Sequence, residues 1–431
     1  MSDELALCGG TRLLPEGFFK KWPPVRPQDR DYVLSVLDRG PGSMDTPHIH
    51  ALEKEWAEYV GTRYSLVTNS GTAALHMSIA ACGLGPGDEV LVPAFTFLAT
   101  ATSVLHHNAI PIFVDVDPET LLIDVPKIEA KITTRTKAII PVHLNGVAAE
   151  MDAIRRIAES HELIVIEDCA QAHGSLYNGT KVGSFGDMAA FSINQWKHLS
   201  ALDGGLVCTD DVELRDKAEM VRTFGERIHT GSRREYNSYT MGWMYRCTDL
   251  VAAFARSQLT RLDEMNAQRI ENCRYLDRHL PEFKGIRLQR IPPGSQATYW
   301  FYVTWISPED MGIDVEPARF RVAVQEALAA EGVNAGLWQS RPVPRQRIFL
   351  DQVGYGKGCP WDCEHYGGAV RYAEEVYPGA QAICDHTVWI SWGFAPDNGP
   401  KELDGIIAAY RKVFDHTDQL VEHAKKVTLD T

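Results

Sequence analysis

The chain lacks the apolar runs that carry a protein into or across a membrane. None of its 431 residues belongs to a stretch long enough to span a bilayer. The first residues, Met1-Ser2-Asp3-Glu4-Leu5, contain neither a basic segment nor a sustained apolar one, so they do not resemble a secretion signal. We therefore expect a soluble protein that stays in the cytoplasm.

Positive charge is also scarce. The chain has 43 Lys and Arg residues against 57 Asp and Glu residues, which gives a formal net charge of −14. A protein that binds the nucleic-acid backbone needs clustered Lys and Arg to displace counterions. The composition therefore excludes a general nucleic-acid binder, although a local basic pocket is compatible with this total.

The nine cysteines lack the paired spacing of a zinc site. Cys359 and Cys363 lie close together with His365 nearby, but a structural zinc site needs a second ligand pair, and only Cys384 follows. We predict no metal, and we interpret the segment around Cys359 as a structured loop.

Internal repeats and low-complexity tracts are absent as well. Hydrophobic residues make up 45% of the chain and charged residues 23%, as in ordinary globular proteins. This length accommodates two domains. The composition therefore favours a folded enzyme.

Between about residue 60 and residue 210, short apolar runs alternate with amphipathic ones. This βα alternation predicts a mostly parallel sheet covered by helices on both faces. The predicted strands are 89–93, 110–116, 137–142, 163–167, 188–192 and 206–209, and the clearest predicted helices are 72–82 and 151–160.

The second half of the chain changes character. The pattern predicts one long helix over 249–265, a strand over 299–306, helices over 316–331 and 401–414, and irregular structure near 350–385. We therefore expect a large α/β domain over 1–255, including an N-terminal arm, and a smaller α+β domain over 256–431.

Lys197 stands out because it follows the predicted buried strand 188–192 and precedes Gly204-Gly205. A lone lysine after a strand is usually a surface residue. In a semi-apolar pocket close to a cation, however, the charged form of its amine is disfavoured and the amine becomes nucleophilic. Such a lysine can hold an aldehyde cofactor as a Schiff base.

Asp168 ends another predicted buried strand, at the edge where open α/β sheets bind their ligands. A carboxylate there can pair with a protonated pyridine nitrogen, or it can simply begin a solvated loop. Gln171 can donate to a phenolate oxygen of such a ring. His173 can support either residue from behind, or it can be a structural histidine.

Hydroxyl groups surround a third predicted feature, the helix that begins at Ser70-Gly71-Thr72. Free N–H groups and the helix dipole favour an anion such as a phosphate at this position, although an ordinary Ser or Thr cap gives the same pattern. Ser192 can supply another hydroxyl. Phe95 and Phe97 close another strand, and one of these rings can stack on a planar cofactor, or both can belong to the core. Together with Asp168 and Lys197, the order of these features indicates pyridoxal 5'-phosphate.

Several segments together resemble the sugar and cyclitol aminotransferases of the DegT/DnrJ/EryC1/StrS family, over about residues 30–415. The matching segments are Asn69-Ser70-Gly71-Thr72-Ala73-Ala74-Leu75, Gly87-Asp88-Glu89-Val90, Pro93-Ala94-Phe95-Thr96-Phe97, Glu167-Asp168-Cys169-Ala170-Gln171-Ala172-His173-Gly174 and Phe191-Ser192 through Lys197. The resemblance implies a fold-type I pyridoxal-phosphate enzyme that works as a homodimer with shared active sites.

The resemblance also implies a role for individual residues. Lys197 is similar to the family's Schiff-base lysine and Asp168 to the partner of the pyridinium nitrogen. Gln171 resembles the phenolate contact and Phe97 the stacking ring. The phosphate cradle is matched by Ser70, Gly71, Thr72 and Ser192.

Two positions depart from the family pattern. Met244 occupies the place of an asparagine that reaches the partner subunit's phosphate in the family, and a methionine side chain cannot donate a hydrogen bond. Pro344 occupies the place of a histidine, with Arg341, Arg345 and Arg347 close by in the sequence.

The resemblance implies amino transfer from glutamine or glutamate to a keto-cyclitol or keto-sugar in secondary-metabolite or aminosugar biosynthesis, and it is strongest to the aminocyclitol branch. Two alternatives remain open from the residues alone. One is a pyridoxal-phosphate-dependent elimination or dehydration on a sugar-like substrate, because Met244 and Pro344 depart from the pattern. The other is a homologue without catalysis that acts as a binding or regulatory subunit.

Overall fold

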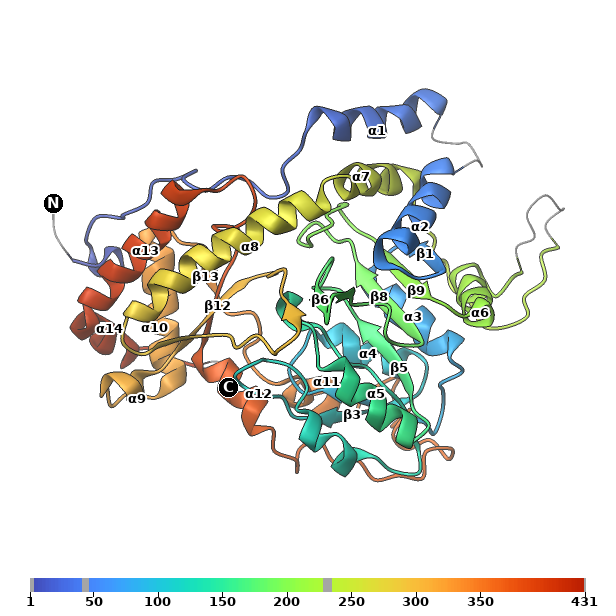
Figure 1. The fold of residues 1–431 in the computed structure, drawn as a ribbon. Helices are drawn as coiled ribbons and strands as arrows, with labels where there is room; N and C mark the ends of the chain where they lie inside the picture. Colours follow the sequence, from blue (N-terminus) through green and yellow to red (C-terminus); the bar gives the residue numbers. More distant parts are fainter. Residues whose placement is uncertain (1–3, 41–45, 228–234, 430–431) are drawn as a thin grey trace.

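The computed structural model describes residues 4–40, 46–227 and 235–429. Its largest element is a seven-stranded sheet with helices packed against it (Figure 1). The strands, in the order in which they lie side by side, are β1 (Tyr64–Thr68), β9 (Gly205–Thr209), β8 (Met188–Ser192), β5 (Ile164–Asp168), β4 (Thr136–Ile139), β2 (Glu89–Pro93) and β3 (Ile110–Val114).

Within this sheet, β9 runs antiparallel to both of its neighbours, β1 and β8, and every other pair of neighbours is parallel. All residues of β2, β3, β8 and β9 are buried, as expected for strands that are covered on both faces. The predicted mostly parallel α/β sheet is therefore confirmed.

Helices pack closely on this sheet. Helix α3 lies against β8 and β9, α4 against β2 and β3, and α5 against β5. The helices of the described residues are α1 (Pro27–Arg39), α2 (Pro47–Val60), α3 (Gly71–Ala81), α4 (Leu98–His106), α5 (Met151–Ser160), α6 (Val212–Arg222), α7 (Asp249–Leu259), α8 (Leu262–His279), α9 (Pro308–Met311), α10 (Pro317–Glu331), α11 (Arg347–Leu350), α12 (Pro378–His386), α13 (Pro400–Asp415) and α14 (Thr417–Ala424).

The C-terminal part is built on a four-stranded antiparallel sheet. Its strands, in spatial order, are β10 (Ile286–Leu288), β12 (Tyr302–Ile306), β14 (Thr387–Ile390) and β13 (Ala335–Gly336). Figure 1 shows α8 running from α7, beside the large sheet, toward α13 and α14. A third, small sheet consists of β11 (Ser295–Gln296), β6 (Leu176–Tyr177) and β7 (Thr180–Lys181).

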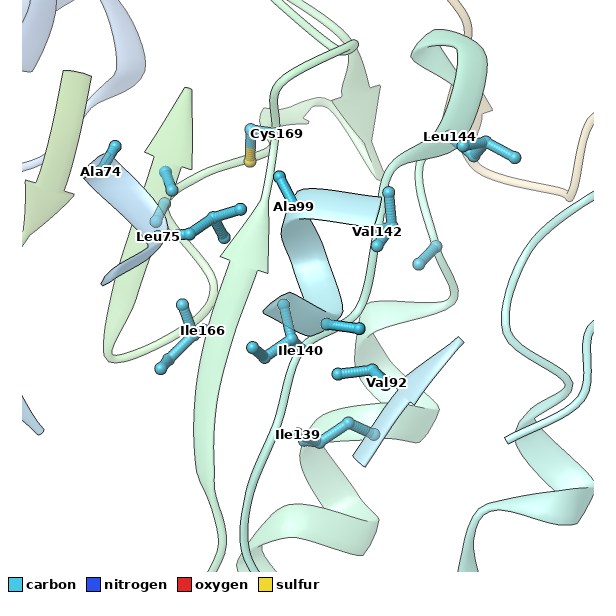
Figure 2. Close-up of a cluster of buried hydrophobic side chains, with 14 of the residues drawn as sticks. Ala74, Leu75, Val92, Ala99, Ile139, Ile140, Val142, Leu144, Ile166 and Cys169 are labelled. Carbon is cyan, nitrogen blue, oxygen red and sulfur yellow. The ribbon is translucent and has the colours of Figure 1, made fainter. Parts of the chain in front are cut away.

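Two clusters of buried apolar side chains form the core. One fills the space around the large sheet, and Figure 2 shows part of it, with Ala74 and Leu75 from α3, Val92 from β2 and Ile166 from β5. The other joins the C-terminal helices to the antiparallel sheet. A division of the chain into domains near residue 255 remains a prediction.

The N-terminal arm packs on the C-terminal part rather than on the large sheet. Leu5 and Leu14 belong to the second core cluster. The carboxylate of Glu331 accepts hydrogen bonds from the backbone N–H groups of Ala6 and Leu13, at 2.8 and 3.0 Å. These bonds anchor the arm along α10.

One predicted helix is wrong in its extent. The pattern predicted a single helix over 249–265, but α7 ends at Leu259 and α8 begins at Leu262. Arg261 lies outside helical geometry, and its guanidinium donates to both carboxylate oxygens of Asp29 on α1. This contact with a distant segment accounts for the break.

Other boundaries also differ from the prediction. The strand predicted from residue 299 begins at Tyr302, because Tyr299 has a left-handed backbone with φ 51°. The region predicted to be irregular near 350–385 contains α12 from Pro378 onward. Strands β1 and β14 were absent from the prediction.

No helix in the described part of the chain is long and apolar enough to cross a membrane.

Candidate active site

Asp168 and Lys197 meet at one edge of the large sheet. Asp168 is the last residue of β5, and Lys197 lies in the hairpin that joins β8 to β9. Strands β5 and β8 are parallel neighbours, so their carboxyl ends lie side by side. The two side chains are close enough for the charge of each to influence the pKa of the other.

Both carboxylate oxygens of Asp168 accept hydrogen bonds. Thr100 on α4 donates its hydroxyl to Oδ2 at 2.8 Å, and the backbone N–H of Ala170 donates to Oδ1 at 3.1 Å. Burial raises the pKa of Asp168, while Thr100, Ala170 and the charge of Lys197 work in the opposite direction. Each oxygen keeps a lone pair that can accept a hydrogen bond from a ligand.

Burial dominates the chemistry of Lys197. As a residue Lys197 is partly exposed, but protein atoms crowd around its amine and lower its pKa from 10.5 to about 7. Asp168 opposes this drop. The sequence predicted both a semi-apolar pocket and a nearby cation, and of these two only burial lowers the pKa in the structure. The amine lies over the indole of Trp300, with Nζ 3.7 Å from the ring centroid.

The hairpin that carries Lys197 is tied together at both ends. The N–H of Ile193 donates to the carbonyl of Gly204, and that of Gln195 donates to the carbonyl of Leu202, at 2.9 and 2.8 Å. The N–H of Lys197 itself donates to the carbonyl of Asn194 at 2.8 Å. The backbone at Lys197 is therefore fixed relative to the sheet.

The predicted phosphate cradle comes together at the start of α3. The hydroxyl of Ser70 accepts from the N–H of Ala73 at 3.0 Å, which makes Ser70 the cap of the helix. A methyl group on Gly71 would lie 2.6 Å from Cβ of Ser192, so only glycine fits there. The N–H groups of Gly71 and Thr72 remain without a partner inside the helix and can bind an anion.

Gly205 on β9 closes this cradle from the other side. A methyl group on Gly205 would lie 2.3 Å from the carbonyl oxygen of Ser70. The starts of α3 and β9 therefore approach each other more closely than any larger residue allows.

Gln171 is buried behind Asp168, and its orientation is set by Asn145. The N–H of Asn145 donates to Oε1 of Gln171 at 2.8 Å. The side-chain carbonyl of Gln171 is therefore occupied, and its Nε2 is the group that can donate to a ligand.

Phe97 stands at the N-terminal end of α4 and is 55% exposed. Its ring is therefore available to a ligand rather than buried in the core. Thr100 lies one turn further along the same helix, so α4 carries both residues toward the edge where Asp168 ends β5.

His173 is fully buried between aromatic rings, including those of Trp56 and Phe191. Burial lowers its pKa to about 3, and the charge of Lys197 adds to this effect. The imidazole is therefore neutral at physiological pH.

A buried group of His143, Glu167 and Cys169 has the composition of a metal site but serves a structural purpose. The carboxylate of Glu167 accepts hydrogen bonds from His143 and from three backbone N–H groups at 183, 185 and 186. Its lone pairs are thus occupied, and three of the four donors belong to the loop after β7. The residues around Cys359 form no comparable cluster within the described part of the chain.

The two departures from the family pattern lie at different places. Met244 is 53% exposed, and its carbonyl accepts from Asn69 beside the start of α3. Pro344 is buried in a short segment whose Val343 donates to the carbonyl of Ala94, just after β2.

The arginines near these two departures differ in their surroundings. Arg345 donates to backbone carbonyls at 373 and 375. The exposed Arg347 pairs with Asp351.

The sequence argument missed three residues around Lys197 and Asp168, namely Thr100, Asn145 and Trp300. Thr100 carried a weak signal, because it lies three positions after Phe97, a predicted ligand contact. Asn145 and Trp300 gave none for this site, because the contact of Asn145 with Phe301 and that of Lys197 with Trp300 join segments more than 100 residues apart.

A mostly parallel α/β sheet with a low-pKa lysine and a buried carboxylate at its carboxyl edge is the arrangement of the pyridoxal-phosphate-dependent aminotransferases of fold type I. The donors at the start of α3 fit the phosphate of that cofactor, and the paired oxygens of Asp168 fit its ring nitrogen. The chain belongs to the DegT/DnrJ/EryC1/StrS aminotransferase family, whose profile matches residues 24–389.

Individual relatives agree with this assignment. The chain is 42% identical, over 79% of its length and 90% of the relative, to GDP-perosamine synthase from Caulobacter vibrioides. It is 32% identical, over 97% of its length and 100% of the relative, to a putative L-glutamine:3-amino-2,3-dideoxy-scyllo-inosose aminotransferase from Streptoalloteichus tenebrarius. The solved structure of DesV from S. venezuelae matches 90% of the chain, over 94% of its own length, with a TM-score of 0.77 at 28% identity. The predictions of family, fold type and aminotransferase activity are thereby confirmed.

Proposed function

We propose that this aminotransferase transfers an amino group from glutamine or glutamate to the ketone of a keto-cyclitol or keto-sugar. The observation that carries the proposal is the pairing of a lysine whose pKa is about 7 with a buried, hydrogen-bonded aspartate at one sheet edge. Relatives named for a keto-cyclitol and for a nucleotide-linked amino sugar support the substrate class.

Pyridoxal 5'-phosphate is the cofactor that these residues would hold. When bound, it supplies an electron-poor ring that accepts carbanion charge from the substrate. We propose that Lys197 binds its aldehyde carbon, that Asp168 pairs with its ring nitrogen, and that the ring lies against Phe97. Gln171 would donate to its phenolate oxygen through Nε2, the amide group that Asn145 leaves available.

The phosphate is assigned to the start of α3. We propose that Gly71 and Thr72 bind it through their backbone N–H groups, while the hydroxyls of Ser70, Thr72 and Ser192 surround it. The support is the tight approach of Gly71 to Ser192, which leaves no room for a side chain between the helix start and β8. A helix N-terminus favours the negative charge of a phosphate.

The amine of Lys197 moves protons during amino transfer. With a pKa of about 7, a large fraction of the amine is neutral at physiological pH. It can accept a proton from the α-carbon of the amino donor and pass it to the carbon of the cofactor's aldehyde group. The carboxylate of Asp168 stays in place at the opposite end of the site, because Thr100 and Ala170 donate hydrogen bonds to it.

We further propose a homodimer with shared active sites, located in the cytoplasm. Several large apolar side chains close to the site are exposed in the single chain, and exposed apolar patches commonly mark protein interfaces. These residues are Phe97, Trp196, Leu202 and Met244.

A panel experiment tests the proposed function. The protein is supplied with pyridoxal 5'-phosphate, with glutamine or glutamate as donor, and with keto-cyclitols or nucleotide keto-sugars as acceptors, and the products are followed by mass spectrometry. We expect one acceptor class to yield an aminated product. Lys197→Ala should abolish it, whereas Lys181→Ala should not, although the amine of Lys181 also lies over an aromatic ring, that of Tyr59. Product at the parent rate from Lys197→Ala would refute the assignment of Lys197.

A further inference from the structure

Asn145 is a fully buried residue that uses all of its polar groups. Its backbone N–H donates to Gln171 and its backbone carbonyl accepts from the N–H of Trp300, at 2.8 and 3.1 Å. Its side-chain Oδ1 accepts from the N–H of Phe301 at 2.6 Å, and its Nδ2 donates to Oε1 of Gln289 at 2.8 Å. One side chain thus fastens the segment that contains Trp300.

The backbone of Asn145 is itself unusual. Its φ of 57° is left-handed, a conformation that asparagine tolerates better than most residues. A strained residue of this kind persists only where its surroundings hold it in place, and such residues concentrate at functional sites. Tyr299, directly before Trp300, is left-handed as well, with φ 51°. Two strained residues therefore determine where the ring of Trp300 lies.

The ring of Trp300 is held on its other side by the hairpin that carries Lys197. Its Nε1 donates to the carbonyl of Trp196 at 2.7 Å. The imidazole of His198 lies 3.2 Å from the carbonyl of Thr298. The indole is consequently fixed between Asn145 and the hairpin, directly beneath the amine of Lys197.

We propose that Asn145 is a positioning residue for the catalytic amine: it holds the Trp300 ring against Lys197 and so keeps water away from that amine. This inference rests on the proposed function, in which Lys197 captures the cofactor. Asn145 acts through Trp300 and has no contact of its own with Lys197 among the hydrogen bonds and ring contacts of the described residues.

The ring of Trp300 has two opposing effects on the pKa of Lys197, and the larger effect decides whether loosening the ring raises or lowers that pKa. The cation–π contact favours the charged amine and raises its pKa by roughly one unit or less. Exclusion of water disfavours the charged amine, and burial by all surrounding atoms lowers its pKa from 10.5 to about 7. In the proposal, the part of this burial that the ring supplies at 3.7 Å outweighs its cation–π attraction. Loosening the ring should therefore raise the pKa of Lys197.

Other titratable groups face the amine but remain unchanged in the test. They are Asp168 on β5, His173 after it, and His198 on the hairpin. Burial lowers the pKa of both histidines far below neutrality, so they do not change charge near pH 7. Replacement of Asn145 by glycine removes no charged group.

The experiment measures how fast the cofactor-free protein captures pyridoxal 5'-phosphate as a function of pH, by the change in cofactor absorbance. Only the neutral amine attacks the aldehyde, so the rate rises with pH around the pKa of Lys197, with a midpoint of about 7 in the parent protein. Asn145→Gly keeps the left-handed backbone accessible but removes both side-chain anchors. We expect its midpoint to rise by about one pH unit.

A matched control is available at Asn178. Asn178 lies in the turn between β6 and β7 and is also a left-handed asparagine, with φ 48°. Its Nδ2 donates to Asp152 on α5 at 3.0 Å. Asn178→Gly removes the same atoms from the same backbone conformation outside the site. Its midpoint should stay at the parent value.

A double variant tests whether Asn145 acts through Trp300. Trp300→Leu should raise the midpoint, and Asn145→Gly combined with Trp300→Leu should raise it no further, because both changes remove the same barrier to water. Shifts that add, or an unchanged midpoint in Asn145→Gly with its fold intact by circular dichroism, would overturn the proposal.

Two further measurements separate the possible failures. If Asn145→Gly does not fold, Gln289→Met removes the acceptor of Asn145 Nδ2 together with the hydrogen bond from Gln289 Nε2 to the carbonyl of Thr120, and an unchanged midpoint in that variant overturns the proposal. If Lys197→Ala captures the cofactor at the parent rate, the proposed function itself fails. Capture that depends on Lys197 but not on Asn145 removes only the role of Asn145.

Discussion

Thr100 donates its hydroxyl to Oδ2 of Asp168 at 2.8 Å, and Thr100 in turn lies 3.0 Å from the hydroxyl of Thr96. All three side chains are buried. The carboxylate that we propose as the partner of the ring nitrogen is thus supported by two hydroxyls in series, one from α4 and one from the segment just before it. Thr100 contacts Asp168 directly and Thr96 contacts Thr100, so the effect of these hydroxyls on Asp168 can be measured by substitution.

Replacing Thr100 by valine should weaken cofactor binding. The change removes the donor to Oδ2 of Asp168 and raises the pKa of that carboxyl further, so the ring nitrogen loses part of its partner's charge. A hydrogen bond to a charged group is worth about 1.5–3 kcal/mol, so we expect the dissociation constant of pyridoxal 5'-phosphate to rise roughly 10- to 100-fold.

The same titration includes two comparison variants. Thr100→Ser should restore most of the affinity, because it keeps the hydroxyl. Thr102→Val should leave the affinity unchanged, since the hydroxyl of Thr102 bonds only to the carbonyl of Leu98 on the same helix. Equal affinities in Thr100→Val and the parent protein would contradict the role of this hydroxyl.

Replacing Phe97 by leucine should weaken cofactor binding without destabilising the protein. The ring of Phe97 is 55% exposed, so little core packing is lost. Stacking between rings contributes about 1 kcal/mol, which corresponds to roughly a fivefold loss of affinity. Phe97→Tyr should retain the affinity. A lower thermal midpoint in Phe97→Leu would indicate that the ring belongs to the core instead.

Replacing Gly71 by alanine should disrupt the phosphate cradle. The added methyl group would lie 2.6 Å from Cβ of Ser192, which forces α3 and β8 apart. We expect both a lower thermal midpoint and at least a tenfold weaker binding of pyridoxal 5'-phosphate, on the order of 1.4 kcal/mol or more. Gly85→Ala is the control, because a methyl group there meets only the carbonyl of His107 at 3.9 Å. Parent-like binding by Gly71→Ala would remove α3 from the proposed cradle.

Replacing Glu167 by glutamine should destabilise the protein without involving the cofactor. One carboxylate oxygen becomes an NH₂ group that faces N–H donors of the loop at 183–186, so buried donors lose their acceptor. We expect the free energy of unfolding to fall by about 3 kcal/mol, measured by urea denaturation.

The pH dependence of this loss has a definite sign. Burial raises the pKa of Glu167, but the bonds from His143 and the backbone outweigh it, so the folded-state pKa lies below the ordinary 4.5. The carboxylate therefore stabilises the fold fully above pH 4.5, and its contribution is lost as the pH falls through the folded value. Glu167→Gln should show a shallower loss of stability in acid than the parent protein. Parallel curves would mean that Glu167 does not contribute to the acid response.

Local sequence patterns were sufficient to predict the strands of the large sheet that are covered on both faces. Strands β2 and β8 have the predicted boundaries, because each is a continuous apolar run that ends where the chain must turn. The positions of Asp168 and Lys197 followed from the same reasoning, since each lies just after such a run. Periodicity is a local property, and these features are determined locally.

Contacts between distant segments were beyond that reasoning. The helix break at Arg261 depends on Asp29, and the position of Trp300 depends on Asn145, so in each case two residues far apart in the sequence set the local geometry. For the low pKa of Lys197, the predicted semi-apolar surroundings agree with the structure, but the predicted cation does not contribute. Desolvation depends on everything that packs around the amine, and the flanking residues reveal only a part of it.

The reversed direction of β9 has a consequence for motion. Because β9 returns antiparallel beside β8, the segment that carries Lys197 is a short closed hairpin, whose ends are joined by hydrogen bonds such as the one from Ile193 to Gly204. The backbone at Lys197 cannot swing as a loop does. When the amine of Lys197 carries a proton from one atom to another, it must move by rotation about the side-chain bonds of the lysine. This movement of a few ångströms is fast and needs no opening of the fold.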